Sequence, residues 1–154
     1  MKAVLKYVYY CDFCKKRYMI KTACEKHEKH CTLNQDRECG LCGIAGRGED
    51  AWHPRPNIRK ICDKYGKKFI LFDRDVYEGV EDLVPIYAEP FTTEDIIDDC
   101  EGCPSCTLTV IRCLGLLSWH FLDKFEYDYK KGLEDFWKEI GDREEEEAER
   151  DTYY

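Results

Sequence analysis

The chain of 154 residues has no long apolar run, and this absence excludes whole classes of protein. No stretch approaches the roughly 18 consecutive apolar residues that a membrane-spanning helix needs, and the mean hydropathy is −0.62. Residues 1–6 also lack the apolar core of a secretory signal. We therefore expect an intracellular protein, cytoplasmic or nuclear. Aromatic residues, at 14%, are too frequent for a disordered chain, so we expect one compact domain or two small ones.

A complete disulfide framework is also excluded, because eleven cysteines cannot all pair with one another. Most of them stand in C-x2-C steps. In a reducing compartment, cysteines clustered in this way are typical metal ligands. The cysteine pattern therefore predicts a metal-binding protein.

The charges are divided unevenly between the two halves of the chain. Residues 1–72 hold 16 Lys and Arg against 8 Asp and Glu, whereas residues 73–154 hold 8 against 24. Such an asymmetry is associated with nucleic-acid contact or with an acidic tail. It is equally consistent with two solvated faces that attract one another within a single fold.

The basic half contains a set of four side chains with metal-ligand spacing. Cys11 and Cys14 form a C-x2-C turn after a short predicted strand over residues 4–10. Residues 21–31 have the composition of a helix, on which His27 and Cys31 project from one face. The predicted ligands are Cys11, Cys14, His27 and Cys31. Two alternatives stay open: His30 could replace Cys31, or Cys24 could be the fourth ligand.

The spacing C-x2-C-x12-H-x3-C over residues 7–33 resembles the classical ββα zinc finger in its Cys-Cys-His-Cys variant. The resemblance implies a zinc ion on the four ligands and a small core built from Tyr9, Tyr18 and Cys24. In that family the base-reading positions correspond here to Ile20, Ala23 and Lys26. Ile and Ala offer no hydrogen bonds to base edges, so we do not expect sequence-specific DNA binding.

Basic residues of the same segment could still neutralise phosphates without reading sequence. They could equally form a solvated face or a docking surface for an acidic partner. The candidate nucleic-acid-binding residues are Lys15, Lys16, Arg17, Lys21, Lys26 and Lys29.

Two further C-x2-C steps resemble the zinc knuckles of zinc ribbons and rubredoxins. The simplest second site combines both steps across some sixty residues, with the ligands Cys39, Cys42, Cys103 and Cys106. A long insertion between the halves is tolerable because the entropy of loop closure grows only logarithmically with length. Alternatively, His53 and Cys62 complete the site of Cys39 and Cys42, which leaves Cys100, Cys103, Cys106 and Cys113 for a third site. The C-x2-C-x2-C run also has some likeness to bacterial iron–sulfur ligands, but the fourth cysteine followed by proline is missing.

The stretch between the knuckles is the best candidate for chemistry. Asp50, His53 and Asn57 faintly resemble the pattern of an HNH-type nuclease, but its adjacent acid–His pair and its closing histidine are missing. Packing of Trp52 and a structural role for His53 explain the same residues without catalysis.

The predicted fold class is a small, zinc-stabilised α+β protein. We expect a finger over 1–34, a zinc-knuckle domain with a short sheet over 35–124, and an acidic, aromatic C-terminal segment over 125–154. In the knuckle domain the pattern predicts a strand over 67–73 with a possible partner over 84–88, a helix capped by Thr92 or Thr93, and a helix from the N-cap Ser105 to about residue 123. A last helix is predicted over about 131–150.

These patterns favour a non-enzymatic zinc protein with two Zn²⁺ ions that acts as a regulator or adaptor. The partner would be a protein, a nucleic acid or a complex that processes nucleic acid. The alternatives are a zinc-braced nuclease and an iron–sulfur redox sensor.

Overall fold

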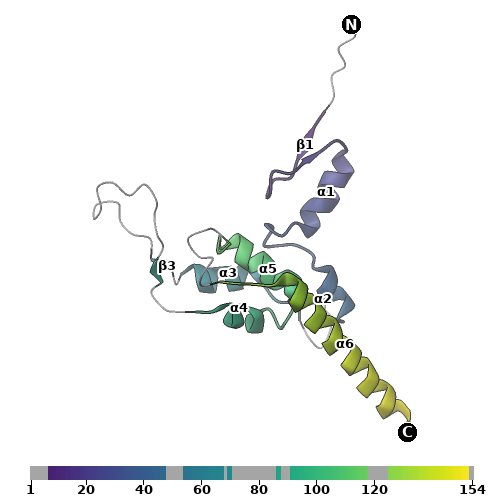
Figure 1. The fold of residues 1–154 in the computed structure, drawn as a ribbon. Helices are drawn as coiled ribbons and strands as arrows, with labels where there is room; N and C mark the ends of the chain where they lie inside the picture. The colour runs from purple at the N-terminus through teal and green to yellow at the C-terminus, as the bar shows by residue number, and fades with distance from the viewer. Residues whose placement is uncertain are drawn as a thin grey trace.

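The computed structural model describes residues 7–47, 54–67, 69–70, 86–87, 91–117 and 125–152. Over these residues the chain forms six helices and two antiparallel sheets of two strands each, so the expected mixture of α and β structure is confirmed (Figure 1). The elements are β1 (Tyr9–Tyr10), β2 (Arg17–Tyr18), α1 (Lys21–His30), α2 (Gly40–Ile44), α3 (Ile58–Gly66), β3 (Phe69–Ile70), β4 (Ile86–Tyr87), α4 (Thr93–Asp99), α5 (Pro104–Cys113) and α6 (Tyr129–Thr152).

The N-terminal segment forms a small ββα unit. β1 pairs antiparallel with β2, with Tyr9 opposite Tyr18, and α1 packs against both strands. Three cysteines are buried in this unit, and Tyr9 and Tyr18 pack against them: Cys11, Cys24 and Cys31. The small core expected from Tyr9, Tyr18 and Cys24 is therefore confirmed.

The main core lies between α3, α4, α5 and α6. α5 is its centre, because α3, α4 and α6 all contact it. Val110 and Ile111 of α5 are fully buried, as is Ile96 of α4, and Tyr65 of α3 is 1% exposed. The ring of Phe91 packs between those of Tyr65 and Phe125 in tilted arrangements, with centroid distances of 4.7 and 5.1 Å. Burial of these side chains supplies the apolar contact that holds the helices together.

The structure corrects both ends of the predicted helix from Ser105 to residue 123. The N-cap is Cys103, with Pro104 in the first turn, where its missing N–H is not needed. The helix ends at Cys113, and Gly115 follows with a φ of +70°. A glycine in the left-handed region ends helices because it carries no Cβ to clash. Leu117, which the predicted helix included, lies beyond this turn and is 41% exposed.

Two helices were not predicted. α3 begins after Asn57, whose side chain accepts a hydrogen bond from the Lys60 N–H, and it buries Ile58, Ile61 and Tyr65. α2 spans the second C-x2-C step, for which the sequence predicted a zinc knuckle but no helix.

The connection from the sheet to α5 agrees with the prediction. β3 and β4 pair with Phe69 opposite Tyr87, although each strand contains only two residues. Thr92 caps α4 through a capping box with Asp95, in which each side chain accepts from the other residue's backbone N–H. This helix leads directly to Cys100 and the knuckle at Cys103.

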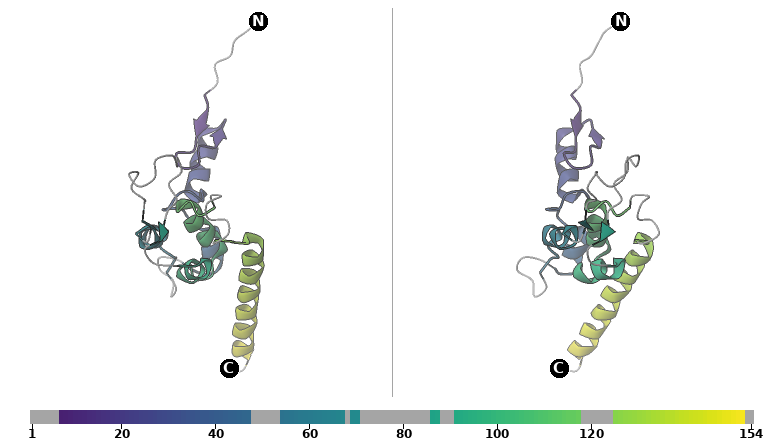
Figure 2. Two further views of the ribbon diagram at one scale, coloured as in Figure 1. Left: turned by 60° about the vertical axis from the view of Figure 1, so that its left-hand side comes forward. Right: turned by 90° about the vertical axis from the view of Figure 1, so that its left-hand side faces the viewer.

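α6 packs on the core through its first part only. Phe136 is 3% exposed and Leu133 and Ile140 are half-buried, whereas Trp137 is 44% exposed. Beyond this point the helix extends away from the core, and the ββα unit projects from the opposite end (Figures 1 and 2). The basic ββα unit and the C-terminal end of α6 therefore lie apart, although Lys64 and Arg47 of the first half of the chain pair with Asp99 and Glu101 of the second half. Among the described residues, no helix is both long and apolar enough to cross a membrane.

Candidate metal centres

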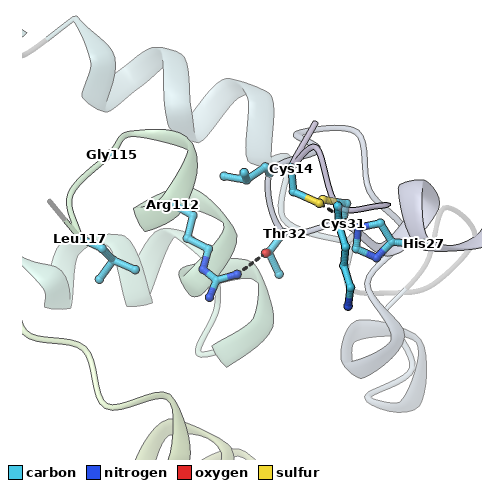
Figure 3. Close-up of a pocket in the computed structure, with 9 residues that line it drawn as sticks. Cys14, His27, Cys31, Thr32, Arg112, Gly115 and Leu117 are labelled. Carbon is cyan, nitrogen blue, oxygen red and sulfur yellow. Dashed lines mark hydrogen bonds between the residues drawn. The ribbon is translucent and has the colours of Figure 1, made fainter. Parts of the chain in front are cut away.

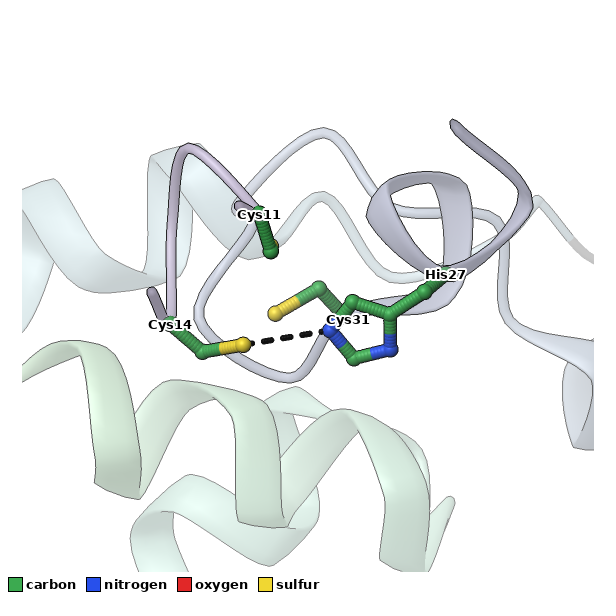
Figure 4. Close-up of side chains that lie close together, drawn as sticks. All are labelled: Cys11, Cys14, His27 and Cys31. Atoms are coloured by element: carbon green, nitrogen blue, oxygen red, sulfur yellow. Dashed lines mark hydrogen bonds between the residues drawn. The ribbon is translucent and has the colours of Figure 1, made fainter. Parts of the chain in front are cut away.

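The first candidate centre joins the turn after β1 to the C-terminal end of α1. Cys11 and Cys14 lie on the two sides of a tight turn, in which the Lys15 N–H donates to the Cys11 carbonyl and Lys15 adopts a φ of +59°. His27 lies on the last turns of α1, and Cys31 is the residue that caps the helix. Figure 4 shows the four side chains pointing toward one another from these elements.

The ligand atoms of this centre lie within 4.8 Å of one another, and the Cys14 Sγ lies 3.1 Å from the His27 Nε2. Neither alternative ligand joins the group. The His30 Nδ1 instead lies 2.9 Å from the Glu38 carbonyl, and the Cys24 Sγ donates to Glu28 at 4.0 Å. The structure therefore brings together the four predicted residues: Cys11, Cys14, His27 and Cys31.

The local environment favours a thiolate at one of these positions. Burial alone would raise the pKa of Cys14, but hydrogen bonds from the Lys16 backbone and from His27 lower it to about 6. Burial raises the pKa of Cys31 to about 11. A metal ion would displace the remaining protons, because thiolates rather than thiols bind metals.

The second candidate centre combines two C-x2-C knuckles, each of which forms the start of a helix. Cys39 is the N-cap of α2 and Cys42 lies in its first turn, while Cys103 is the N-cap of α5 and Cys106 lies in its first turn. The positive end of a helix dipole favours negative charge, so both helix starts suit thiolates. All four sulfurs lie within 4.8 Å of one another, and none of the four residues is more than 5% exposed.

The sulfur spacing of this centre fits a tetrahedral metal. Cys39 Sγ lies 3.6 Å from Cys103 Sγ, and Cys42 Sγ lies 3.5 Å from Cys106 Sγ. Two thiolates on one tetrahedral Zn²⁺ would be about 3.8 Å apart, given a Zn–S bond of about 2.3 Å. The four residues therefore fit a zinc ion, and they belong to the split arrangement rather than to two separate sites.

The same contacts drive the sulfur pKa values apart. Hydrogen bonds from the other three sulfurs lower the pKa of Cys39 far below its ordinary value, and such contacts raise the pKa of Cys106. Four thiols in contact thus share protons unequally. Binding of a dication would replace these protons and release them to solvent.

Arg47 is a residue beside this centre that the sequence did not single out. Its side chain is 8% exposed and its guanidinium pairs with Glu101 at 3.6 Å, while its backbone N–H donates to the Cys42 carbonyl at 2.8 Å. A Zn²⁺ ion on four thiolates has a formal charge of −2, which a buried cation nearby would offset. A single arginine in a glycine-rich stretch carries no sequence signal for this role.

The remaining candidates are not brought to either centre. Cys62 and Cys113 lie on α3 and α5, and Cys100 is the residue after α4. The geometry thus contradicts the alternative that places Cys62 with Cys39 and Cys42, and the third site that takes Cys103 and Cys106. His53 and Asp50, on which the nuclease interpretation depends, lie outside the described residues.

The surface of the ββα unit is both basic and apolar. All six candidate phosphate-binding side chains are exposed: Lys15, Lys16, Arg17, Lys21, Lys26 and Lys29. Large apolar side chains are exposed on the same unit, including Ile20 at 63%, Tyr10 at 57% and Met19 at 54%. Ile20 and Met19 stand immediately before α1, at the end where the resemblance places base-reading side chains.

A pocket of about 550 Å³ lies where the ββα unit meets the end of α5 (Figure 3). Cys14, His27 and Cys31 line one side, and Arg112 and Leu117 line the other. Arg112 donates to the Thr32 hydroxyl at 2.7 Å, and this bond connects the two units. The cations of the pocket, Lys16 and Arg112, would partly offset the formal charge of −1 of a zinc ion on three thiolates and one histidine.

Comparison of the chain with family models, with curated proteins and with solved structures finds no match in any of the three.

Proposed function

We propose that this chain is a non-enzymatic zinc-binding protein, in which two structural Zn²⁺ ions hold a small scaffold and the ββα unit docks on an acidic protein partner. The observation that carries the docking proposal is the surface of that unit. Met19 and Ile20 are exposed immediately before α1, and exposed lysines stand on the same unit.

The two candidate centres support a structural rather than a catalytic role for the metal. Each has four protein ligands, which is the full complement of a tetrahedral zinc ion. A catalytic zinc keeps one position open for water or substrate. A closed ion contributes folding free energy, because the unfolded chain cannot hold it with the same geometry.

The reading end of the finger supports a protein rather than a DNA duplex as the partner. Ile20 and Ala23 offer no hydrogen bonds to base edges, so only Lys26 could contact a base or a phosphate there. Protein interfaces, in contrast, have apolar centres with polar rims. An acidic partner surface would complement the exposed lysines and speed the encounter.

The metal part of the proposal is tested by native mass spectrometry with elemental analysis. We expect two zinc ions per chain and no inorganic sulfide. Iron with sulfide would overturn the proposal for the second centre, and a single bound ion would overturn the two-site arrangement.

The docking part is tested by quantitative capture of partners from a nuclease-treated lysate of the source cells, with the zinc-loaded full-length protein as bait. The double variant Met19→Asp/Ile20→Asp should lose the captured protein. The matched control is Ile44→Asp, because Ile44 is 60% exposed but lies on α2, outside the ββα unit. The control should retain the partner.

A different pattern would favour nucleic acid. The capture is therefore repeated in a lysate without nuclease treatment. Capture that appears only there, that is lost on Lys15→Glu/Lys26→Glu substitution and that survives Met19→Asp/Ile20→Asp would overturn the docking proposal. Any residual DNA binding should be weak, independent of sequence and steeply dependent on salt concentration.

A further inference from the structure

The pocket between the ββα unit and the end of α5 has no part in the proposed function. Its volume of about 550 Å³ lies within the range of about 300–1,000 Å³ that is usual for small-molecule sites. Thr32 and Leu33 of its lining follow the end of α1, whereas Met19 and Ile20 precede the start of that helix. Since ten helical residues span about 15 Å, the pocket and the proposed docking surface lie at opposite ends of α1.

Two cations line this pocket, and neither pairs with a carboxylate among the described residues. Arg112 donates from Nη1 to the Thr32 hydroxyl at 2.7 Å, and this acceptor is neutral (Figure 3). The Lys16 Nζ lies 5.8 Å from the centroid of the Tyr18 ring. None of the lining residues that the structure describes is acidic. The pocket therefore presents positive charge that could bind an anion.

The first metal centre does not cancel this charge. Cys14, His27 and Cys31 line the other side of the pocket, and a zinc ion on three thiolates and one histidine has a formal charge of −1. The two cations, Lys16 and Arg112, exceed this by one positive charge. A bound monoanion would leave the loaded pocket neutral, whereas a cation would add to the excess.

Two exposed leucines give the pocket an apolar wall. Leu33 is 37% exposed and Leu117 is 41% exposed, and both belong to the lining. An aliphatic chain that covers them removes apolar surface from water, which is favourable in proportion to the area buried. The bond from Arg112 to Thr32 uses one of the five N–H donors of the guanidinium, so others remain to bind a carboxylate.

We propose that this pocket binds an aliphatic monocarboxylate, with the carboxylate on Arg112 and Lys16 and the chain on Leu33 and Leu117. The inference rests on the zinc ion proposed for the first centre, because three ligands of that centre form one wall of the pocket. Binding of the carboxylate and of this zinc ion are then coupled. By the reciprocity of linked equilibria, the carboxylate should raise the affinity of the first centre for zinc.

The test titrates octanoate into the zinc-loaded full-length protein and follows the leucine methyl signals by nuclear magnetic resonance. We expect saturable shifts of Leu33 and Leu117. Octanol, which lacks the charge, and octyltrimethylammonium, which reverses it, should bind about tenfold more weakly, because hydrogen bonds to charged groups are the stronger ones. The proposal is overturned if octanoate causes no saturable shift, or if all three compounds bind equally well.

Substitutions of exposed residues test the charged and the apolar parts of the site separately. Lys16→Gln should weaken octanoate binding about threefold and Arg112→Gln about tenfold. The matched control Lys26→Gln lies on the ββα unit outside the described lining and should leave binding unchanged. Leu117→Asp should abolish binding, whereas Ile44→Asp, at an exposed position on α2, should not. Equal effects of the lining and control substitutions would contradict the site.

Competition with a chelator tests the coupling to zinc. Saturating octanoate should raise the chelator concentration that removes zinc from the first centre and leave the second centre unaffected, and an unchanged concentration would overturn the inference. Native mass spectra of the same samples separate this inference from the proposed function. Fewer than two zinc ions per chain would overturn both, whereas a two-zinc protein that does not bind octanoate would overturn only the inference.

A protein segment could carry the same carboxylate chemistry, and the capture experiment distinguishes this source. If Arg112→Gln and Leu117→Asp remove the captured protein while octanoate shows no saturable binding, the pocket belongs to the protein interface and the small-ligand proposal is wrong. If octanoate binds and the captured protein is retained in both variants, the free carboxylate is the ligand.

Discussion

Burial does not separate the ligand cysteines of this chain from the others. Cys42 of the second centre and Cys100 of the main core are both fully buried, and Cys24 is as inaccessible as Cys39. What differs is the set of neighbours, because Cys42 faces other sulfurs whereas Cys24 faces a carboxylate. At the scale of single residues, function therefore depends on which side chains meet, and substitutions are best designed from those contacts.

The central position of Ile111 in the main core leads to a prediction about stability. Its side chain is fully buried on α5, so Ile111→Ala should lower the free energy of unfolding by about 2–5 kcal/mol through lost transfer energy and the cavity left behind. Denaturant titration of the zinc-loaded protein measures this. Ile44→Ala is the matched control, because Ile44 is 60% exposed and its loss should cost no more than about 0.5 kcal/mol. Equal effects of the two substitutions would contradict the position of the core.

Tyr65 makes the stability of the protein sensitive to alkaline pH. Burial, followed by its hydrogen bond to Asp99, raises the pKa of the phenol. The folded protein therefore keeps this proton above about pH 10, where an unfolded tyrosine loses it, and the associated stability is lost as pH rises through the folded-state pKa. We expect the free energy of unfolding to fall above pH 10 by up to about 1.4 kcal/mol per pH unit for this group.

Tyr65→Phe should reduce that slope, as measured by denaturant titrations between pH 9 and 11. The comparison variant is Tyr10→Phe, whose ring is 57% exposed on the ββα unit. An unchanged slope in Tyr65→Phe would show that the phenol does not ionise differently in the folded and unfolded chains.

Contacts between side chains could be predicted from the sequence where the spacing of two residues along the chain is enough to bring them together. The steps at Cys11, Cys39 and Cys103 place their partners three positions away, so the local turn brings both sulfurs to one side whatever the rest of the fold does. The contacts of Arg47 with Glu101 and of Arg112 with Thr32 depend on how the helices and loops pack in space. No periodicity or motif in the sequence predicts such contacts, so only the structure reveals them.

At the scale of elements, the turn after α5 decides where that helix ends. Gly115 has a φ of +70°, and no neighbouring atom lies within 4 Å of the position that a Cβ would take. Gly115→Ala should therefore cost about 1 kcal/mol from backbone strain alone. Gly141→Ala, within α6 and equally free of neighbours, should instead stabilise by about 0.5–1 kcal/mol. Thermal unfolding of both variants measures the difference, and a neutral Gly115→Ala would contradict the left-handed turn.

Elements with a local signal were the ones that could be predicted. The capping signature at Thr92 gave the start of α4, and helix-forming composition gave α1 to within one residue. α5 was extended too far because its apolar pattern continues past Gly115, where the backbone changes direction. α3 does carry a signal, since Ile58, Ile61, Cys62 and Tyr65 recur at helical spacing after a capping asparagine. The short α2 has only five residues, and no periodic pattern is visible over that length.

At the scale of the whole molecule, few contacts join the ββα unit to the main core. Among the described residues they include the hydrogen bond from Arg112 to Thr32 and that from the Glu38 N–H to the Lys29 carbonyl. Cys11→Ala should therefore release one zinc ion and unfold residues 7–33 while α3, α4 and α5 remain folded. Amide spectra by nuclear magnetic resonance would show the loss residue by residue.

Cys42→Ala is the complementary variant, because the second centre connects α2 to α5 within the main core. It should release the other zinc ion and lower the midpoint of unfolding of the core helices. A single cooperative transition in which Cys11→Ala melts the entire chain would contradict the separation of the two units.

The placement of the ββα unit and α6 at opposite ends has an electrical consequence (Figure 2). Residues 7–33 carry exposed lysines, whereas residues 141–152 contain seven Asp and Glu against two Arg. Separation of opposite charges along the long direction gives the molecule a large permanent dipole moment in addition to its net charge of −8. In the field of a highly charged surface the molecule would experience a torque before any contact forms, and it would arrive with one end foremost. Its orientation at encounter would thus be selected at long range, and high salt would abolish that selection by screening the field.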